Sequence, residues 1–282
     1  MVIREIITQC IGILKDAGND NPIFESHLIV RHYLKMEAID LVLQKNEEIT
    51  QLQQNKILTA ARRRIKGEPL QYILGCQEFM GLEFKVSRDV LIPRPDTEIL
   101  VEYILEKYSQ RGMMALDIGT GSGCIAVSLA CCNRRAYVKA VDISGSALDI
   151  ARFNADSHGV SGRVSFMRAD AFSLDIKGRF DVIVSNPPYI ETDVIPTLDS
   201  VVKDYEPLRA LDGGADGLMF YRTITEKAPS LLNDSGMLAF EIGYNQAEAV
   251  TSLMEKDFFN IEITKDLNGN DRVAAGVLKR RK

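Results

Sequence analysis

The strongest constraint on the fold is an apolar run that ends in two consecutive prolines. Residues 180–185 are rich in β-branched side chains, which is typical of a strand buried on both faces of a parallel sheet. Pro187 and Pro188 cannot donate a ladder hydrogen bond, and they restrict the residues before them to extended backbone. The strand must therefore end in a stiff turn that holds Asn186 and Tyr189. In α/β enzymes, ligands bind at such turns, outside the carboxyl ends of strands.

Strands and helices alternate from Met113 onward, which predicts a parallel sheet with helices on both faces. The last two strands are joined through Asn268 and Gly269, a pair that strongly indicates an antiparallel hairpin. The sequence thus predicts an α/β fold with a Rossmann-like, seven-stranded, mostly parallel sheet that ends in this hairpin. The expected strands are 115–118, 137–142, 164–167, 181–184, 237–242, 261–265 and 272–278.

Residues 1–75 are expected to form a small all-α domain in front of the sheet. Ile3 and Ile6 begin an apolar pattern at helical spacing, and Pro22 suits the first turn of a second helix. Thr50 and Gln53 have the spacing of a capping box, opening a helix that is predicted to run to residue 65 and to stop at residue 67. Apolar alternation with glycines predicts a β-hairpin linker over 76–93, so the sheet domain covers 94–282.

Length and charge limit the possible functions. A chain of 282 residues can bury a full core and has room for two domains. The formal net charge of −5 argues against a protein whose main task is to grip phosphate backbones, because such domains usually carry a basic face. The basic runs at 62–64 and 279–282 leave room for a local patch, although solvated helix and tail charges are the simpler interpretation.

The five cysteines show neither paired zinc spacing nor a secreted disulfide pattern, so we expect reduced thiols in a cytosolic protein. The first ten residues contain Arg4 and Glu5 and therefore lack the apolar core of a signal peptide. The longest uncharged run, over 118–133, contains three glycines and is shorter than the roughly 20 apolar residues that a membrane span needs. We therefore expect no membrane association.

A proline-arginine-proline segment precedes the first predicted helix of the sheet domain. Pro93 and Pro95 flank Arg94, which would stiffen its backbone and present the guanidinium at a fixed place. A simpler interpretation is a helix start with Asp96 and Glu98 in its first turn, where acidic residues are favoured. The pattern alone leaves both interpretations open.

A glycine-rich loop follows the first predicted strand of the sheet and opens a helix over 124–130. Glycines let the backbone approach a ligand closely, and a helix amino terminus favours electronegative groups. The dinucleotide fingerprint would place its third glycine at position 124, where this chain has a cysteine. The loop also lacks the Gly-Lys-Ser/Thr ending of a nucleotide triphosphate P-loop. Its candidate binding residues are Asp117, Gly119, Thr120, Gly121, Ser122 and Gly123.

Acidic residues follow the next two strands. Asp142 ends the second strand, where a carboxylate can accept hydrogen bonds from both hydroxyls of an adenosine ribose. Asp170, Ala171 and Phe172 follow the third strand beside the same crevice, where they could bind the adenine amino group and cover its ring. Asp142 could instead cap the helix near Ser144, and Asp170 could cap a turn. As a spaced set with the loop, these residues favour adenosine binding.

The loop, Asp142 and the terminal hairpin together resemble class I S-adenosylmethionine-dependent methyltransferases. The helical front domain, Ile92-Pro-Arg-Pro-Asp-Thr-Glu98 and Asn186-Pro-Pro-Tyr-Ile190 resemble the peptide chain release factor N(5)-glutamine methyltransferase family, often called HemK or PrmC. This resemblance covers essentially the whole chain. One departure is Ala171, where related sequences carry a bulkier aromatic residue, so Phe172 is expected to contact the adenine.

The resemblance implies both the ligands and the roles of several residues. The cofactor would be S-adenosylmethionine, held by the loop, Asp142, residues 170–172 and Asn186. The substrate would be the glutamine amide in the Gly-Gly-Gln loop of class I release factors, a step of translation termination. Residues 1–75 would contact the release factor, and Arg94 would help to bind the substrate loop.

The Asn186-Pro-Pro-Tyr turn offers the chemistry that such a reaction needs. An amide nitrogen is a poor nucleophile, so it must be oriented toward the methyl group that it attacks. The side-chain oxygen of Asn186 and the main-chain carbonyl of Pro187 can accept the two N–H bonds of the target NH2. Pro188 keeps the turn rigid, and the ring of Tyr189 can pack against the planar amide. Metal ions and covalent nucleophiles are not required for this chemistry.

Two other functions are compatible with parts of the pattern. An N(6)-adenine methyltransferase would present the same two N–H groups to the same turn, but it usually needs a basic groove to extract its base. A non-catalytic adapter could keep the fold and use the helical domain to bind a partner. The acidic net charge disfavours the adenine methyltransferase. The intact Asn186-Pro-Pro-Tyr turn disfavours the adapter. We expect a monomer that binds a protein substrate and does not bind nucleic acid directly.

Overall fold

The computed structural model describes residues 1–280, which fall into two compact units. The first comprises Met1–Cys76 together with the segment Asp199–Tyr205, and the second comprises Gln77–Leu198 and Glu206–Lys282. The basic tail considered above therefore lies partly outside the described residues, at positions 281 and 282. Within the described part, none of the helices combines the length and the apolar character needed to cross a membrane.

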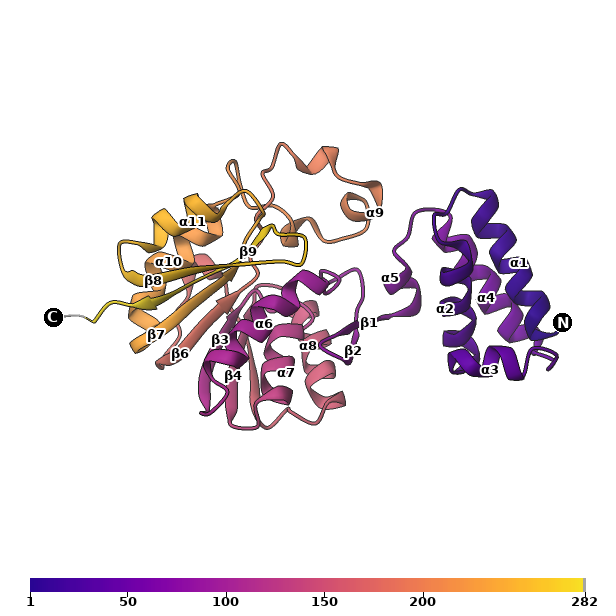
Figure 1. Cartoon of the computed structure of the whole chain (residues 1–282), viewed down its shortest axis with the longest axis horizontal. Coiled ribbons are helices and arrows are strands. Elements are labelled where there is room, and N and C mark those ends of the chain that lie inside the picture. Colours follow the sequence, from indigo (N-terminus) through magenta and orange to yellow (C-terminus); the bar gives the residue numbers. More distant parts are fainter. Residues whose placement is uncertain (281–282) are drawn as a thin grey trace. The chain divides into compact units, whose positions relative to one another are not determined.

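The first unit is helical (Figure 1). Its helices are built around one apolar cluster. The pattern that begins with Ile3 and Ile6 forms one buried stripe, and Pro22 occupies the first turn of the second helix as predicted. The predicted capping box is also confirmed, because the Gln53 amide donates to Thr50 Oγ1 (3.2 Å) and the Thr50 amide donates to Gln53 Oε1 (2.9 Å). The helices are α1 (Ile3–Asp16), α2 (Pro22–Leu34), α3 (Ala38–Leu43), α4 (Gln51–Arg64), α5 (Leu70–Leu74) and α9 (Ser200–Lys203).

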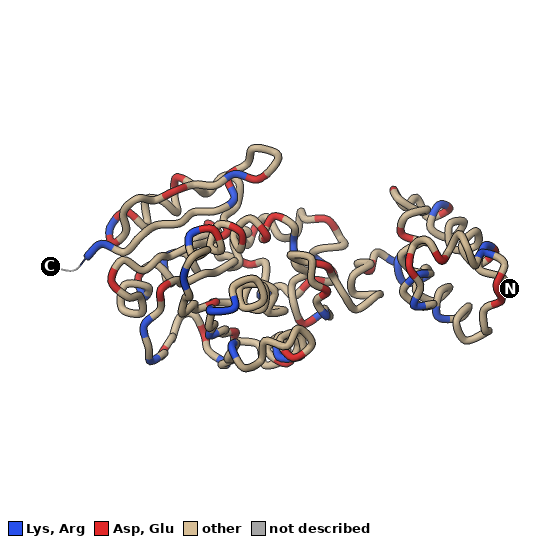
Figure 2. Tube along the Cα trace, turned by 60° about the horizontal axis from the view of Figure 1, so that its bottom comes forward, with Lys and Arg blue, Asp and Glu red and all other residues tan. Residues whose placement is uncertain are grey.

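The basic run at the end of α4 is partly neutralised within the first unit. Arg63 pairs with Glu68 and Arg64 pairs with Glu25, each at 2.7 Å. Figure 2 shows acidic and basic residues interspersed along both units. The acidic partners are largely buried, with side chains that are 8% and 14% exposed, and the pairs reduce the charge that a phosphate backbone would meet. These contacts support the interpretation of the run as helix charges.

The second unit contains a mostly parallel seven-stranded sheet, as the sequence predicts (Figure 1). The strands are β3 (Met113–Ile118), β4 (Ala136–Asp142), β5 (Val164–Arg168), β6 (Phe180–Ser185), β7 (Leu232–Glu241), β8 (Phe258–Lys265) and β9 (Asp271–Leu278). Their order is β5-β4-β3-β6-β7-β9-β8, and β9 runs antiparallel to both β7 and β8. The two-stranded sheet of β1 (Cys76–Phe79) and β2 (Leu82–Lys85) precedes it.

Two strands begin at least three residues earlier than their apolar patterns suggest. β7 starts at Leu232 rather than residue 237, and polar residues 233–235 interrupt its apolar run. β8 starts at Phe258 rather than residue 261, with a register shift between Phe259 and Glu262. In both cases pairing with a neighbouring strand extends the ladder beyond the apolar segment, which a local pattern cannot indicate.

Helices cover both faces of the sheet and leave its carboxyl edge open for a ligand. α6 (Pro95–Lys107) and α7 (Cys124–Cys132) pack on one face, with α8 (Gly145–Ser157) against α7. α10 (Met219–Leu231) and α11 (Ala247–Met254) pack on the other. The chain leads outward from β3 through β4 to β5 and then returns to β6 on the other side of β3. This reversal makes the carboxyl ends of β3 and β6 a topological switch point, where α/β sheets bind ligands.

Candidate active site

A cavity of about 440 Å³ lies at the switch point, within the second unit. Its walls include the glycine-rich loop after β3, the end of β4, the segment after β5 and the turn after β6. Among the predicted site residues, it is lined by Arg94, Gly119, Thr120, Gly121, Ser122, Asp142, Asp170, Ala171, Phe172, Asn186, Pro187 and Pro188. The lining residues range from Asp89 to Ile224, so segments far apart in the sequence converge on one cavity.

The glycine-rich loop is open toward a ligand at two of its glycines. Gly119 and Gly121 have φ angles of +78° and +55°, and a Cβ on either would meet no atom within 4 Å. The loop is tied to the end of β4, because the amides of Gly119 and Thr120 both donate to the Val141 carbonyl (2.9 and 3.0 Å). Glycine adopts these positive φ angles without strain, and the open space beside it suits a ligand that approaches the main chain closely.

The third glycine has a different role. Gly123 also has a positive φ, of +81°, but a Cβ there would lie 3.0 Å from the Cβ of Ala151 on α8. Asn154, one turn further along α8, donates to the Ser122 carbonyl (2.8 Å). Gly123 therefore allows close packing between α7 and α8. It is absent from the cavity lining, although Ser122 is part of it.

Asp117 supports the glycine-rich loop through a buried hydrogen bond. Its side chain is fully buried, and Oδ2 accepts a hydrogen bond from Thr120 Oγ1 (2.6 Å). Its other oxygen, Oδ1, has no hydrogen-bond partner among the described residues. Burial, assisted by the nearby charge of Asp142, raises the pKa of Asp117 to about 7. Asp117 does not line the cavity, so any influence on a ligand passes through the loop.

Replacing Asp117 by asparagine tests this burial. Because the pKa rises from 3.8 in the unfolded chain to about 7 in the folded one, folding favours the protonated form. The free energy of unfolding should therefore fall as the pH rises through this window, by roughly 4 kcal/mol at most from this group. Asp117→Asn cannot titrate, so urea unfolding at pH 5 and pH 8 should show a smaller difference than in the wild type. An equal pH difference in both proteins would contradict the assignment.

The two predicted acidic residues that line the cavity accept main-chain hydrogen bonds. Asp142 accepts from the amides of Gly121 (2.9 Å) and Ser144 (2.8 Å), and Asp170 accepts from the amide of Phe172 (2.9 Å). The capping interactions considered above are thus present, although the cap of α8 itself is Ser144. A carboxylate has about four lone-pair sites, so these bonds leave capacity for ligand donors. The carboxylates are held in place beside the cavity that they line.

The turn after β6 is held in place by residues that were not among the predicted site residues. The Asn186 Nδ2 group donates to Thr97 Oγ1 on α6 (3.1 Å), and the Tyr189 carbonyl accepts from Gln246 Nε2 (3.0 Å). Gly217 lies so close that a Cβ would be 2.4 Å from the Tyr189 carbonyl oxygen. Among residues 1–280, Oδ1 of Asn186 has no hydrogen-bond donor.

Tyr189 itself lies outside the cavity lining. Its side chain is partly buried against the apolar cluster between the sheet and α10, and burial raises its pKa to about 12. Packing of this ring against a substrate amide therefore stays a prediction. In this structure the ring instead helps to hold the turn against the core.

Arg94 lines the cavity and is fixed by a buried acid. It is the residue before α6, whose first position is Pro95, and its guanidinium pairs with Glu206. The Glu206 side chain is 1% exposed. Both earlier interpretations of this segment therefore apply, since it starts a helix and also fixes an arginine.

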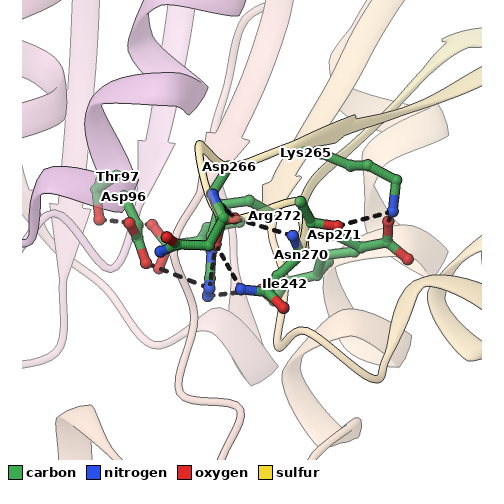
Figure 3. Close-up of polar contacts among 11 residues, drawn as sticks. Asp96, Thr97, Ile242, Lys265, Asp266, Asn270, Asp271 and Arg272 are labelled. Carbon is green, nitrogen blue, oxygen red and sulfur yellow. Dashed lines mark hydrogen bonds and ion pairs between the residues drawn. The ribbon is translucent and has the colours of Figure 1, made fainter.

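The acidic residues of that helix start have partners across the fold. Figure 3 shows Asp96 facing Arg272 of β9, with an oxygen-to-nitrogen distance of 3.2 Å, and Arg272 also pairs with Asp266 (3.1 Å). Glu98 accepts a hydrogen bond from the amide of Met80 (2.6 Å). These contacts fix the start of α6, and with it Thr97, relative to the sheet.

Comparison with known proteins gives the family. A family model described as the PrmC N-terminal domain matches residues 5–75, and one described as the Methyltransferase small domain matches residues 95–204. Among solved structures, the chain is similar to a methyltransferase from Pyrococcus furiosus (20% identity, TM-score 0.54, covering 82% of this chain and 99% of that one). It is also similar to the ribosomal protein L11 methylase from Lactobacillus delbrueckii subsp. bulgaricus (20% identity, TM-score 0.50, 69% and 84%). These likenesses confirm the fold.

Curated relatives match over nearly their whole length. The release factor glutamine methyltransferase of Geobacter sulfurreducens is 41% identical over 275 residues, covering 97% of this chain and 96% of the relative. That of Chlorobaculum tepidum is 38% identical over 280 residues, covering 96% and 95%. That of Thermodesulfovibrio yellowstonii is 43% identical over 253 residues, covering 88% and 90%. The protein therefore belongs to the release factor glutamine methyltransferase family.

Proposed function

We propose that this enzyme transfers a methyl group from S-adenosylmethionine to the side-chain amide nitrogen of the glutamine in the Gly-Gly-Gln motif of class I peptide chain release factors. Membership of the family supports the reaction. The observation that carries the proposal is the turn after β6, where Asn186 is held by its NH2 group so that its oxygen remains available. The protein would act in the cytosol as a monomer, without direct binding of nucleic acid.

The cavity fits S-adenosylmethionine in its chemistry. Gly119 and Gly121 leave open space beside the backbone, which suits a ligand that lies against the main chain. Asp142 would accept from the ribose hydroxyls, and Asp170 would accept from the adenine amino group. Phe172, whose ring is 5.1 Å from that of Phe220, would help to cover the adenine. When bound, the cofactor supplies a methyl group on a positively charged sulfur.

The residues of the turn would orient the amide that is methylated. Oδ1 of Asn186 and the carbonyl of Pro187 would each accept one N–H bond of the target NH2. Two fixed acceptors aim the nitrogen and select a primary amide or amine, and the prolines keep their spacing constant. In the reaction the amide nitrogen would form a bond to the methyl carbon as the bond between that carbon and the sulfur breaks, and one amide proton would leave to solvent. Acceptors that are held in place before the substrate binds would need little reorganisation.

Mass spectrometry tests the reaction. Purified class I release factor incubated with this protein and S-adenosylmethionine should gain one methyl group on the glutamine of its Gly-Gly-Gln motif. A release factor with that glutamine replaced is the matched control and should gain none. Labelled methyl transfer to DNA or RNA, with release factor unmodified, would instead indicate the adenine methyltransferase. Cofactor binding without transfer to any of these substrates would indicate an adapter.

The helical unit is proposed to bind the release factor, with Arg94 contacting the substrate loop. Removing residues 1–75 should raise the KM for release factor at least tenfold, a loss of about 1.4 kcal/mol of binding. Affinity for S-adenosylmethionine should remain, because the cavity lies within the second unit. Calorimetry with the cofactor serves as the control for folding. Equal catalytic efficiency in the truncated and full-length proteins would contradict this role.

A further inference from the structure

Three polar side chains from three elements form a chain of hydrogen bonds behind the turn. Asn186, directly after β6, donates from Nδ2 to Thr97 Oγ1 in the first turn of α6 (3.1 Å). Thr97 in turn donates to Oε2 of Glu241, the last residue of β7 (2.5 Å). Thr97 and Glu241 are each 2% exposed, so water does not compete for these bonds. Figure 3 shows Thr97 next to Asp96 on α6.

These hydrogen bonds all run in one direction, from Asn186 through Thr97 to Glu241. A hydroxyl group has one proton, and an ionised carboxylate can only accept. The Thr97 proton is therefore used by Glu241, which leaves the Thr97 oxygen as an acceptor. Only the NH2 end of the Asn186 amide can bind that acceptor. The amide oxygen must then face away from Thr97, and Asn186 lines the cavity.

We propose that Thr97 and Glu241 are positioning residues that determine which end of the Asn186 amide faces the substrate. The inference rests on the proposed function, because an exposed oxygen matters only when the substrate brings an N–H donor. With the amide reversed, the NH2 group of Asn186 would face the NH2 group of the target, and two donors cannot pair. The hydrogen bonds from Asn186 through Thr97 to Glu241 thus make the site selective for a substrate group that donates hydrogen bonds.

The protonation state of Glu241 controls the direction of the hydrogen bonds through Thr97. Burial is the largest influence and raises its pKa to about 7, opposed by the hydrogen bond from Thr97, by the charge of Arg272 of β9 and by the nearby Asn186 side chain. The other titratable or charged groups that interact with it are Asp96 of α6, Cys124 of α7, Tyr189 after β6 and Tyr221 of α10. A protonated Glu241 can donate to Thr97, whose proton can then turn to Asn186 and reverse the amide. Turnover should therefore fall as the pH falls below about 7.

Substitution of Thr97 provides the test with full-length protein and release factor. Thr97→Val removes the hydroxyl at similar volume and should lower kcat about tenfold, which corresponds to one hydrogen bond of about 1.4 kcal/mol. Thr97→Ser keeps the hydroxyl and should recover most of the turnover. Thr225→Val is the matched control, because Thr225 is buried and its hydroxyl has no partner among the described residues. It should leave kcat unchanged.

Two further readouts separate positioning from a merely structural effect. The kcat of the wild type at saturating cofactor should have an acidic limb, and Glu241→Gln, which cannot ionise, should lack it. The side-chain NH2 signal of Asn186 in ¹⁵N NMR without substrate should shift in Thr97→Val and should titrate with pH in the wild type. This signal reports the orientation of the amide independently of turnover.

The outcomes distinguish this inference from the proposed function. A wild type that methylates no release factor would refute the function, while the NMR signal would still test the hydrogen-bond chain. An active wild type, with either kcat or the Asn186 signal unchanged in Thr97→Val, would overturn the inference. The same holds if Glu241→Gln keeps the acidic limb.

Discussion

Replacing Asn186 by alanine is expected to lower turnover by about a hundredfold or more, the effect of losing one preorganised polar partner. The side chain contributes an oxygen at the cavity, and its NH2 group is held by Thr97. Alanine removes the oxygen without filling the space, so the target nitrogen would lose one of its two fixed acceptors. The measurement is kcat with purified release factor and a labelled methyl donor. Cofactor affinity, measured by calorimetry, should be largely retained.

Two matched variants control for simple loss of a carboxamide. Asn233→Ala removes another half-buried asparagine, near the start of β7, whose NH2 group donates to Asp181 of β6 (2.8 Å). This variant should keep near-normal turnover. Asn186→Asp keeps an oxygen but cannot donate to Thr97 when ionised, so it should not recover activity. Near-normal turnover in Asn186→Ala would refute the assigned role. A parallel loss of cofactor affinity would instead place Asn186 mainly against the cofactor.

Much of the fold could be predicted because its signals are local. The double proline after β6 ends a strand wherever it occurs, and the capping box at Thr50 needs only Gln53 to form. Asn268 and Gly269 lie in the predicted connection between β8 and β9, where Gly269 takes a φ of +85°. The three glycines of the loop after β3 also lie close together in the sequence, at positions 119, 121 and 123. Each of these features depends on residues within a few positions of one another.

The hydrogen bonds and ion pairs that hold the site residues in place could not be predicted, because the partners in each pair are distant in sequence. Thr97 and Glu241 are 144 residues apart, and Arg94 and Glu206 are 112 residues apart. In the sequence, Glu241 resembles an ordinary polar residue at the end of an apolar strand. Only the folded sheet brings it next to Thr97, which binds Asn186. A local pattern identifies the groups that face the cavity, but only the tertiary fold shows which buried side chains orient them.

Gly217 is expected to show the second large effect. It follows Gly213 and Gly214 in a glycine-rich segment that packs against the turn after β6. A Cβ on Gly217 would lie 2.4 Å from the Tyr189 carbonyl oxygen and 2.7 Å from Gln246 Nε2. These two atoms are themselves hydrogen-bonded partners, so the new methyl group would separate them. The turn that carries Asn186 must then move.

Gly217→Ala should therefore lower kcat at least tenfold and up to about a hundredfold, because displacing a positioned group by about 1 Å can cost that much. The substitution also introduces an alanine at a φ of +68°, which costs about 1 kcal/mol of stability by itself. Gly159→Ala is the matched control, since Gly159 has the same φ of +68° and open space around its Cβ position. Both variants should lose similar stability from backbone strain in urea unfolding, but only Gly217→Ala should lose turnover. If the two variants kept equal kcat values, close packing against the Tyr189 carbonyl would not be what holds Asn186 in place.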